Sequence, residues 1–107
     1  LISGNHWSCF ARSPLYGFYV CDSNGTNIKT VRSIYRYKIK ELVHFNSSPL
    51  MRPKSSYCAM FSSCFASVFF DNPDAEFSEL LSYMGVTRDL VRNEQNVVSY
   101  VQTELIT

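Results

Sequence analysis

Cys58 is the residue of this chain best placed for covalent chemistry, because it follows a small polar segment and opens a strongly apolar one. Apolar residues then recur at three- and four-residue steps, which predicts a helix buried along most of its girth: Met60, Phe61, Cys64, Phe65, Val68 and Phe69. We expect Ser55 or Ser56 to cap this helix. A thiol in its first turn lies near the partial positive charge of unpaired backbone N–H groups. That charge favours the thiolate, the form that attacks a carbonyl carbon.

The competing interpretation is that Cys58 belongs to the core. Cysteine is among the most buried residue types, and a cysteine in a Phe-rich helix usually packs in the interior. For this reason we expect Cys64, further along the same helix, to be a core residue. A catalytic role for Cys58 therefore depends on partners elsewhere in the chain.

A histidine and an aspartate are predicted to meet at one end of a β-hairpin. Residues 5–11 alternate in polarity and 18–21 favour strand, and a dense turn signal, Asp22-Ser23-Asn24-Gly25, ends the second strand. In an antiparallel pair the start of the first strand lies beside the end of the second, so His6 and Asp22 share one sheet edge. A carboxylate there would fix the imidazole tautomer and leave the other nitrogen free to take a proton. The alternatives are that Asp22 only makes the turn and that His6 only faces solvent.

The remaining segments are predicted to be helices. An amphipathic pattern covers residues 27–44, a further helix starts at Asn72-Pro73 and ends at Gly85, and Thr87 caps the last one. We therefore expect an α+β fold, in which a small antiparallel sheet packs on a central helix that begins at Cys58.

Basic side chains form a ridge beside the apolar stripe of the helix expected over residues 27–44: Lys29, Arg32, Arg36 and Lys40. Such a ridge can contact a phosphate backbone, so DNA is a candidate partner. More often a ridge of this kind is only a solvated helix face. The formal net charge of +1 gives no overall attraction to nucleic acid or membrane.

Length and composition indicate one folded domain over residues 1–107. The chain is 46% hydrophobic and 15% aromatic, which is enough for a single modest core. No apolar run reaches the roughly 18 residues of a membrane span, and no signal-peptide layout is present, so we expect a soluble intracellular monomer without a membrane partner. The chain begins with Leu1, and Trp7 already resembles a core strand residue. We therefore expect that an amino-terminal part of the domain is missing.

The cysteine pattern predicts neither a metal nor a cofactor. The four cysteines, Cys9, Cys21, Cys58 and Cys64, include no C-x-x-C pair of the kind that binds zinc or serves redox chemistry. An extracellular protein with disulfides remains an alternative, because Asn24 and Asn46 both begin glycosylation patterns. Buried thiols explain the cysteine count equally well.

Four motifs follow one another in an order that resembles a known family: His6-Trp7, Asp22-Ser23, Cys58-Ala59-Met60-Phe61, and Arg92-Asn93-Glu94-Gln95 within residues 91–100. The order and spacing resemble the adenovirus maturation protease family (adenain) and, more distantly, the SUMO-deconjugating cysteine proteases of the same clan. The similarity runs over most of the chain.

The resemblance implies a thiol protease in which His6 is the general base, Asp22 orients it and Cys58 attacks the peptide carbonyl to form a thioester. It further implies a viral endopeptidase that processes capsid or core precursor polypeptides during virus maturation, located in the virion and the host cell nucleus. The family also has a Gln before the nucleophile that helps to hold the oxyanion, and this chain has none there. Arg52, Lys54 and Ser55 are the candidate substitutes.

Other functions fit the same residues. Without the oxyanion Gln, the chain could be a catalytically decayed member of the fold that acts as a virion or protein-binding component. An isopeptidase on ubiquitin-like modifiers, or an acetyltransferase, would use the same His-acid-Cys arrangement. These enzymes differ from a maturation protease in acceptor and in substrate groove, and not in the first step of chemistry.

Overall fold

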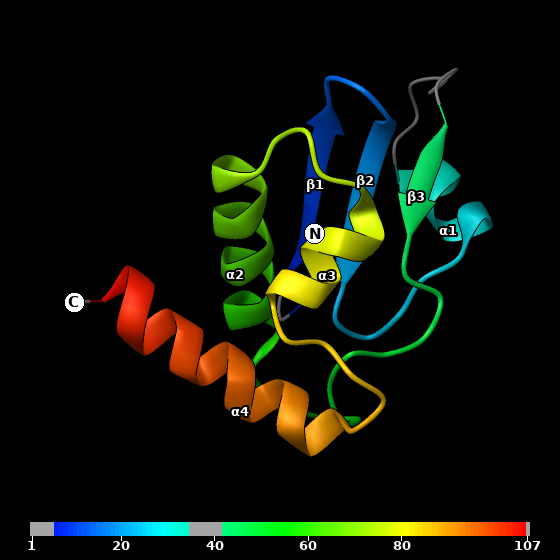
Figure 1. The fold of residues 1–107 in the computed structure, drawn as a ribbon. Coiled ribbons are helices and arrows are strands. Elements are labelled where there is room, and N and C mark those ends of the chain that lie inside the picture. Colours follow the sequence, from blue (N-terminus) through cyan, green and yellow to red (C-terminus); the bar gives the residue numbers. More distant parts are fainter. Residues whose placement is uncertain (1–5, 35–41, 107) are drawn as a thin grey trace.

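The computed structural model describes residues 6–34 and 42–106, which form a three-stranded sheet with helices packed around it (Figure 1). In chain order the elements are β1 (Ser8–Ser13), β2 (Gly17–Asp22), α1 (Ile28–Ile34), β3 (Val43–Phe45), α2 (Cys58–Asp71), α3 (Phe77–Tyr83), α4 (Leu90–Tyr100) and η1, a π-helical turn (Val101–Leu105). The strand order in the sheet is β1-β2-β3. The expected α+β class is confirmed.

The predicted hairpin is present, and its tight turn fixes its register. β1 and β2 pair antiparallel from Ser13 opposite Gly17 to Ser8 opposite Asp22. The Ser13 hydroxyl accepts hydrogen bonds from the backbone N–H groups of Leu15 and Tyr16. Gly17 has a φ of +99°, and a Cβ there would collide with the backbone carbonyl of Leu42. Glycine is therefore required where the second strand begins.

The central helix is α2, which packs against β1, β2, α3 and α4. Its buried side chains recur at steps of three and four residues, as the periodicity predicts: Cys58, Phe61, Cys64, Phe65 and Val68. The helix begins at Cys58, the predicted start. Figure 1 shows α2 lying along the sheet, with the warm-coloured carboxy-terminal helix crossing its first turns.

The helix predicted over residues 27–44 is wrong at its carboxyl end. α1 ends at Ile34, residues 35–41 lie outside the described part of the chain, and Val43–Phe45 form β3. β3 pairs parallel to β2, with His44 opposite Tyr19. The sheet is therefore mixed and not purely antiparallel. Valine and phenylalanine favour strands, and pairing with a buried neighbour strand outweighs the helical period that these residues happen to continue.

The cap residues predicted for α2 and α3 are wrong. Neither Ser55 nor Ser56 caps α2, whose cap residue is Tyr57. The Ser55 hydroxyl accepts from the Tyr57 backbone N–H at 3.4 Å, within the preceding loop. Asn72 does not begin α3, because its side-chain amide donates to the Val68 carbonyl and so closes the end of α2.

The caps of the last two helices come from acidic residues. α3 starts at Phe77 after a reciprocal capping box between Glu76 and Glu79. α4 is capped by Asp89, which accepts from the Arg92 N–H at 3.1 Å, and not by the predicted Thr87.

Trp7 is not the core strand residue that the sequence indicated. It precedes β1 and is 56% exposed.

Two phenylalanines of α2 should differ strongly in their contribution to stability. Phe61 is 0% exposed whereas Phe70 is 86% exposed. We expect Phe61→Ala to lower the free energy of unfolding by about 3–5 kcal/mol, through lost burial and the remaining cavity. The matched control Phe70→Ala should change it by no more than about 0.5 kcal/mol. Urea denaturation of the three proteins measures both, and equal effects would contradict the packing described here.

Candidate active site

His6 and Asp22 are brought together at the end of the hairpin. The His6 Nε2 lies 2.8 Å from the Asp22 Oδ1, and the two side chains are 16% and 10% exposed. The hairpin register explains this contact, because Ser8 is directly opposite Asp22 and His6 lies just before it in the chain. The geometry predicted from the register is therefore confirmed.

The Asp22 backbone is held in place by a residue that the sequence singled out only as a possible glycosylation site. The Asn46 side chain is buried, accepts from the Asp22 N–H at 2.9 Å and donates to the Asp22 carbonyl. Its amide also donates to the Ser48 carbonyl. Because the Asn46 amide nitrogen is bonded inside the protein, it is a poor acceptor for a glycan.

Asn24 fixes the tautomer of His6. Its side-chain amide Nδ2 lies 3.2 Å from the His6 Nδ1, and its backbone N–H donates to the Asp22 Oδ1 at 2.9 Å. An amide nitrogen only donates and a carboxylate only accepts, so the neutral ring carries its proton on Nε2 and its lone pair on Nδ1. The lone pair of His6 is therefore on Nδ1, where it accepts a hydrogen bond from the Asn24 side-chain amide.

Cys58 occupies the first position of α2, as predicted, and is 7% exposed. It belongs to the same buried cluster as Cys21, the neighbour of Asp22 in β2. Figure 1 shows α2 beginning at the end of the sheet where β1 starts and β2 finishes. The topology thus directs all three candidate residues, His6, Asp22 and Cys58, to one end of the molecule.

Cys64 differs from Cys58 in its surroundings. It is 0% exposed, and burial raises the pKa of its thiol to about 12. A thiol with so high a pKa holds almost no thiolate at neutral pH. The prediction that Cys64 is a core residue is confirmed.

The loop before Cys58 is tied to α4 by a buried carboxylate. Glu94 is 3% exposed and receives three hydrogen bonds from Arg52: from Nε at 3.0 Å, from an η nitrogen at 2.9 Å and from the backbone N–H at 3.0 Å. The hydrogen bonds of Arg52 hold the pKa of Glu94 below its usual value. A bidentate pair of this kind fixes orientation as well as charge.

Asn93, next to Glu94 on α4, is fully buried and fastens the same region. Its side-chain amide donates to the carbonyls of Leu50 and Thr87, and its oxygen accepts from the Thr87 N–H. The apolar periodicity of the last helix does not reveal these polar contacts. The only sequence signal is the run Arg92-Asn93-Glu94-Gln95, which carries part of the family resemblance.

The resemblance leaves open which residue near the start of α2 would replace the absent oxyanion Gln. Of the three candidate substitutes for the absent Gln, Arg52 has its guanidinium engaged by Glu94. Lys54 has a φ of +63°, a left-handed backbone conformation uncommon for a residue with a side chain. The side chain of Tyr57, the residue that precedes α2, makes no capping hydrogen bond to the first turn of this helix.

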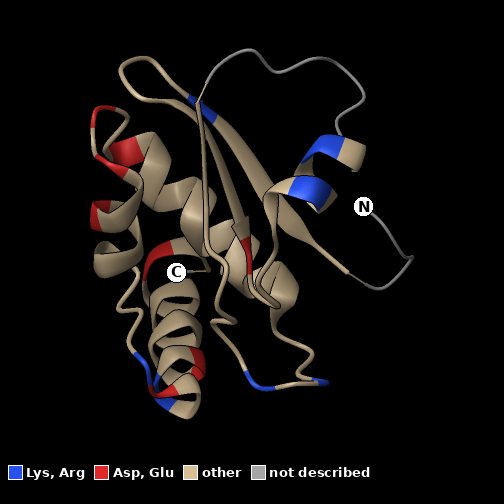
Figure 2. Ribbon diagram, turned by 90° about the vertical axis from the view of Figure 1, so that its right-hand side faces the viewer, with Lys and Arg blue, Asp and Glu red and all other residues tan. Residues whose placement is uncertain are grey.

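The basic ridge is described only in part. Lys29 and Arg32 are exposed on α1, and Figure 2 shows them as the blue segments of that helix. Arg36 and Lys40 lie outside the described residues. A nucleic-acid contact through the four residues therefore stays a prediction.

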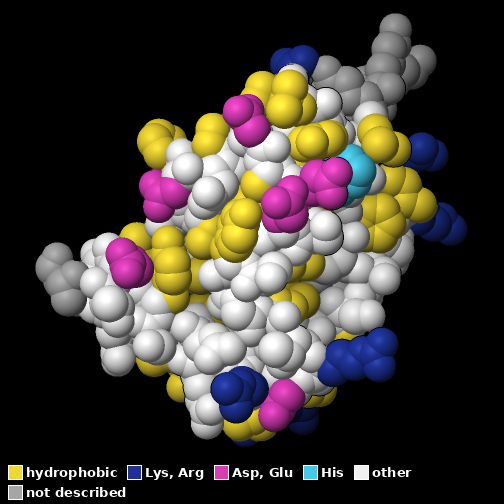
Figure 3. Space-filling model, viewed as in Figure 1, with side chains coloured by type: hydrophobic (Ala, Val, Ile, Leu, Met, Phe, Trp, Pro, Cys, Tyr) yellow, Lys and Arg dark blue, Asp and Glu magenta, His cyan; other side chains and the backbone are white. Residues whose placement is uncertain are grey.

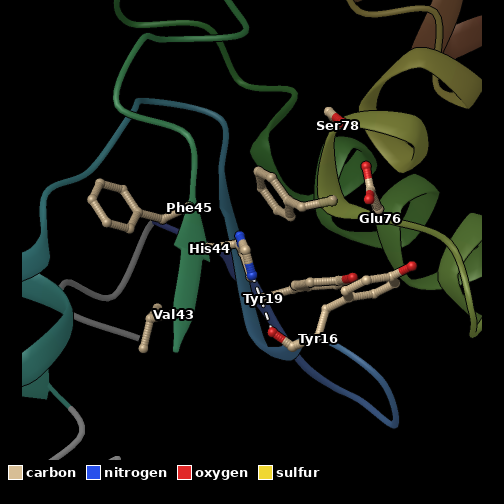
Figure 4. Close-up of a pocket in the computed structure, with 8 residues that line it drawn as sticks. Tyr16, Tyr19, Val43, His44, Phe45, Glu76 and Ser78 are labelled. Carbon is tan, nitrogen blue, oxygen red and sulfur yellow. Dashed lines mark hydrogen bonds between the residues drawn. The ribbon is translucent and has the colours of Figure 1, made fainter. Parts of the chain in front are cut away.

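A separate cavity of about 450 Å³ lies toward the hairpin turn, at the opposite end of the hairpin from Asp22. Figure 4 shows its lining from the turn, β3 and α3, including the hydrogen bond of 3.0 Å between the His44 Nε2 and the Tyr16 carbonyl. Figure 3 shows acidic side chains and a histidine together on this face.

In residues 6–34 and 42–106, no three His, Cys, Asp or Glu side chains form a metal-binding group. In the same residues, no helix is long and apolar enough to cross a bilayer.

No protein-family model, curated protein or solved structure matches this chain. The catalytic roles expected for His6, Asp22 and Cys58 therefore stay a prediction, which depends on the geometry described above and on the motif order in the sequence.

The Glu94–Arg52 pair predicts a particular loss of stability in acid. A carboxyl whose folded-state pKa is lowered contributes stability above its ordinary pKa of 4.5, and this stability is lost as the pH falls through the lowered value. We expect the free energy of unfolding to fall below pH 4.5, and Glu94→Gln to remove part of that fall. Glu104→Gln, at an exposed position, is the control. Identical acid profiles for both variants and the parent would contradict the role of the pair.

Proposed function

We propose that this domain is a cysteine endopeptidase in which His6, Asp22 and Cys58 form the catalytic triad. The observation that carries the proposal is the 2.8 Å hydrogen bond between His6 and Asp22 at the sheet end where α2 begins with Cys58. An imidazole oriented by a carboxylate, at the same end of the sheet as the start of a helix that begins with a thiol, supports nucleophilic acyl transfer.

The chemistry follows from the tautomer of His6. The Nδ1 lone pair accepts the Cys58 proton, the sulfur attacks the scissile carbonyl, and first-turn N–H groups of α2 stabilise the oxyanion. The tetrahedral intermediate collapses to a thioester as the imidazolium gives its proton to the leaving amine. His6 then activates water, which hydrolyses the thioester. Asp22 holds the ring and stabilises its charged form throughout.

Asn24 has to yield before the first proton transfer. Its amide occupies the His6 Nδ1 at 3.2 Å, the position that the Cys58 thiol must take. In this proposal the structure represents a resting state, in which substrate binding or thiol approach displaces a weak and exposed hydrogen bond. Such a displacement costs little, because the net value of an ordinary hydrogen bond is about 0.5–1.5 kcal/mol.

The substrates proposed are viral capsid or core precursor polypeptides, by the motif resemblance. The rival function is a protein-binding component of the same fold without catalysis. One observation favours the rival, namely that Cys58 is only 7% exposed. A substrate carbonyl would have to reach the sulfur through this small opening or through a local widening of the loop before α2.

Thiol labelling separates the two functions. Because the proposal makes His6 the base that takes the Cys58 proton, we expect Cys58 to react with iodoacetamide at neutral pH faster than Cys9 or Cys64 does. His6→Ala should slow this reaction about 10-fold or more, because it removes the base that helps to deprotonate the thiol. Site-resolved mass spectrometry measures each rate.

His44→Ala is the matched control, because His44 lies on β3 and bonds the Tyr16 carbonyl. It should leave the Cys58 rate unchanged. If Cys58 labels no faster than Cys64 and His6→Ala changes nothing, the protease proposal fails and the binding component is favoured.

Asn24→Ala should have the opposite effect to His6→Ala. Removing the amide frees the Nδ1 lone pair, and we expect Cys58 labelling to become about 2- to 10-fold faster, the range set by one modest hydrogen bond. The same substitution in the His6→Ala background should have no effect, since its action passes through the ring. An equal acceleration in both backgrounds would show that Asn24 acts only through loop structure.

A further inference from the structure

Two cysteines face one another across the hairpin. Cys9 of β1 is directly opposite Cys21 of β2 in the antiparallel register, and both are thiols in the structure. Directly opposed residues have Cα atoms about 4.5 or 5.5 Å apart, depending on the type of pair. Both separations fall in the range of about 4.4–6.8 Å that disulfides adopt. Opposed side chains also point to the same face of the sheet, so the two sulfurs need no change of strand register to meet.

The surroundings of the pair make one thiol accessible and the other not. Cys9 is partly exposed, whereas Cys21 is 1% exposed in the core. Burial raises the pKa of both thiols, and the pKa of Cys21 is raised further by its electrostatic interactions with Cys9, Asp22 and Cys64. The interaction between Cys9 and Cys21 supports the proximity given by the register. Cys64 is the competing partner for Cys21 from the side of α2.

We propose that Cys9 and Cys21 are a modification site, at which a two-electron oxidant of the peroxide class forms a reversible disulfide across the hairpin. The Cys9 thiolate attacks one peroxide oxygen, the O–O bond breaks, and Cys9 becomes a sulfenic acid as water leaves. The Cys21 sulfur then attacks the Cys9 sulfur and a second water leaves. Two thiols are oxidised by two electrons in all, and the peroxide is reduced to two waters. A dithiol reductant reverses the reaction.

A disulfide between Cys9 and Cys21 would lie close to the His6–Asp22 contact. Cys9 opposite Cys21 is the ladder pair next to Ser8 opposite Asp22, which leads into the His6–Asp22 contact. A covalent bond here closes the hairpin at its open end and restrains the two strand ends that carry the contact. The inference does not depend on the protease proposal, because the thiols involved are not those of the triad.

Tryptic mapping tests the proposal directly, since the sequence separates the cysteines. Cleavage after Arg12 and Lys29 places Cys9 in residues 1–12 and Cys21 in residues 13–29, whereas Cys58 and Cys64 share the peptide 55–88. The purified chain is treated with hydrogen peroxide, its remaining thiols are blocked with iodoacetamide, and it is digested without reductant. We expect peptides 1–12 and 13–29 to be joined in monomeric protein and to separate after dithiothreitol. Oxidation should be about tenfold faster at pH 8 than at pH 7, because the thiolate fraction rises tenfold per unit below the pKa.

Cys9→Ser is the first control and should abolish the joined species, while Cys58→Ser should leave it unchanged. The proposal is overturned if peptide 13–29 is joined mainly to 55–88, which would identify Cys64 or Cys58 as the partner of Cys21. It is also overturned if Cys9 is oxidised to sulfinic acid without any cross-link, or if the joined peptides come only from dimers separated on a non-reducing gel.

Discussion

The burial of α2 against the hairpin is the interaction on which the rest of the structure depends. Phe61 and Phe65 are 0% exposed, and Tyr19 of β2 is equally buried in the same cluster. Phe65 and Tyr19 both pack against Phe77 of α3, with ring centroids 5.7 and 5.4 Å apart. Apolar burial of this extent fixes the direction of α2. The direction of α2, in turn, sets which end of the sheet its first residue faces.

Buried polar side chains hold the loops that the apolar core does not position. Asn46 brackets the backbone of Asp22, and Asn93 and Glu94 fasten the loop that leads to Cys58. Each is almost completely buried and has its hydrogen bonds satisfied within the protein. Buried and satisfied polar groups of this kind specify one arrangement of neighbouring loops, because any other arrangement would leave them without partners.

The sequence pattern predicted the elements that depend mainly on residues close together in the chain. The hairpin followed from its turn residues, and α2 followed from the spacing of Phe61, Cys64 and Phe65, including its start at Cys58. The His6–Asp22 contact was predictable because a hairpin register relates distant residues through a short turn. β3 was not predictable in this way. Its pairing with β2 is set by the tertiary structure, and Val43–Phe45 happens to continue a helical period. The buried roles of Asn46 and Glu94 were missed for the same reason, since nothing in a linear pattern shows which polar residues will be enclosed.

The parallel pairing of β3 with β2 has a consequence for the order of folding. The hairpin closes through a short turn, so its ladder forms from neighbours in the chain. β3 is joined to β2 through a longer connection that contains α1, so its pairing has the larger entropic cost of loop closure. A kinetic experiment should therefore find β3 docking onto a hairpin that already exists, so that amide protons around Val20 become protected in two stages.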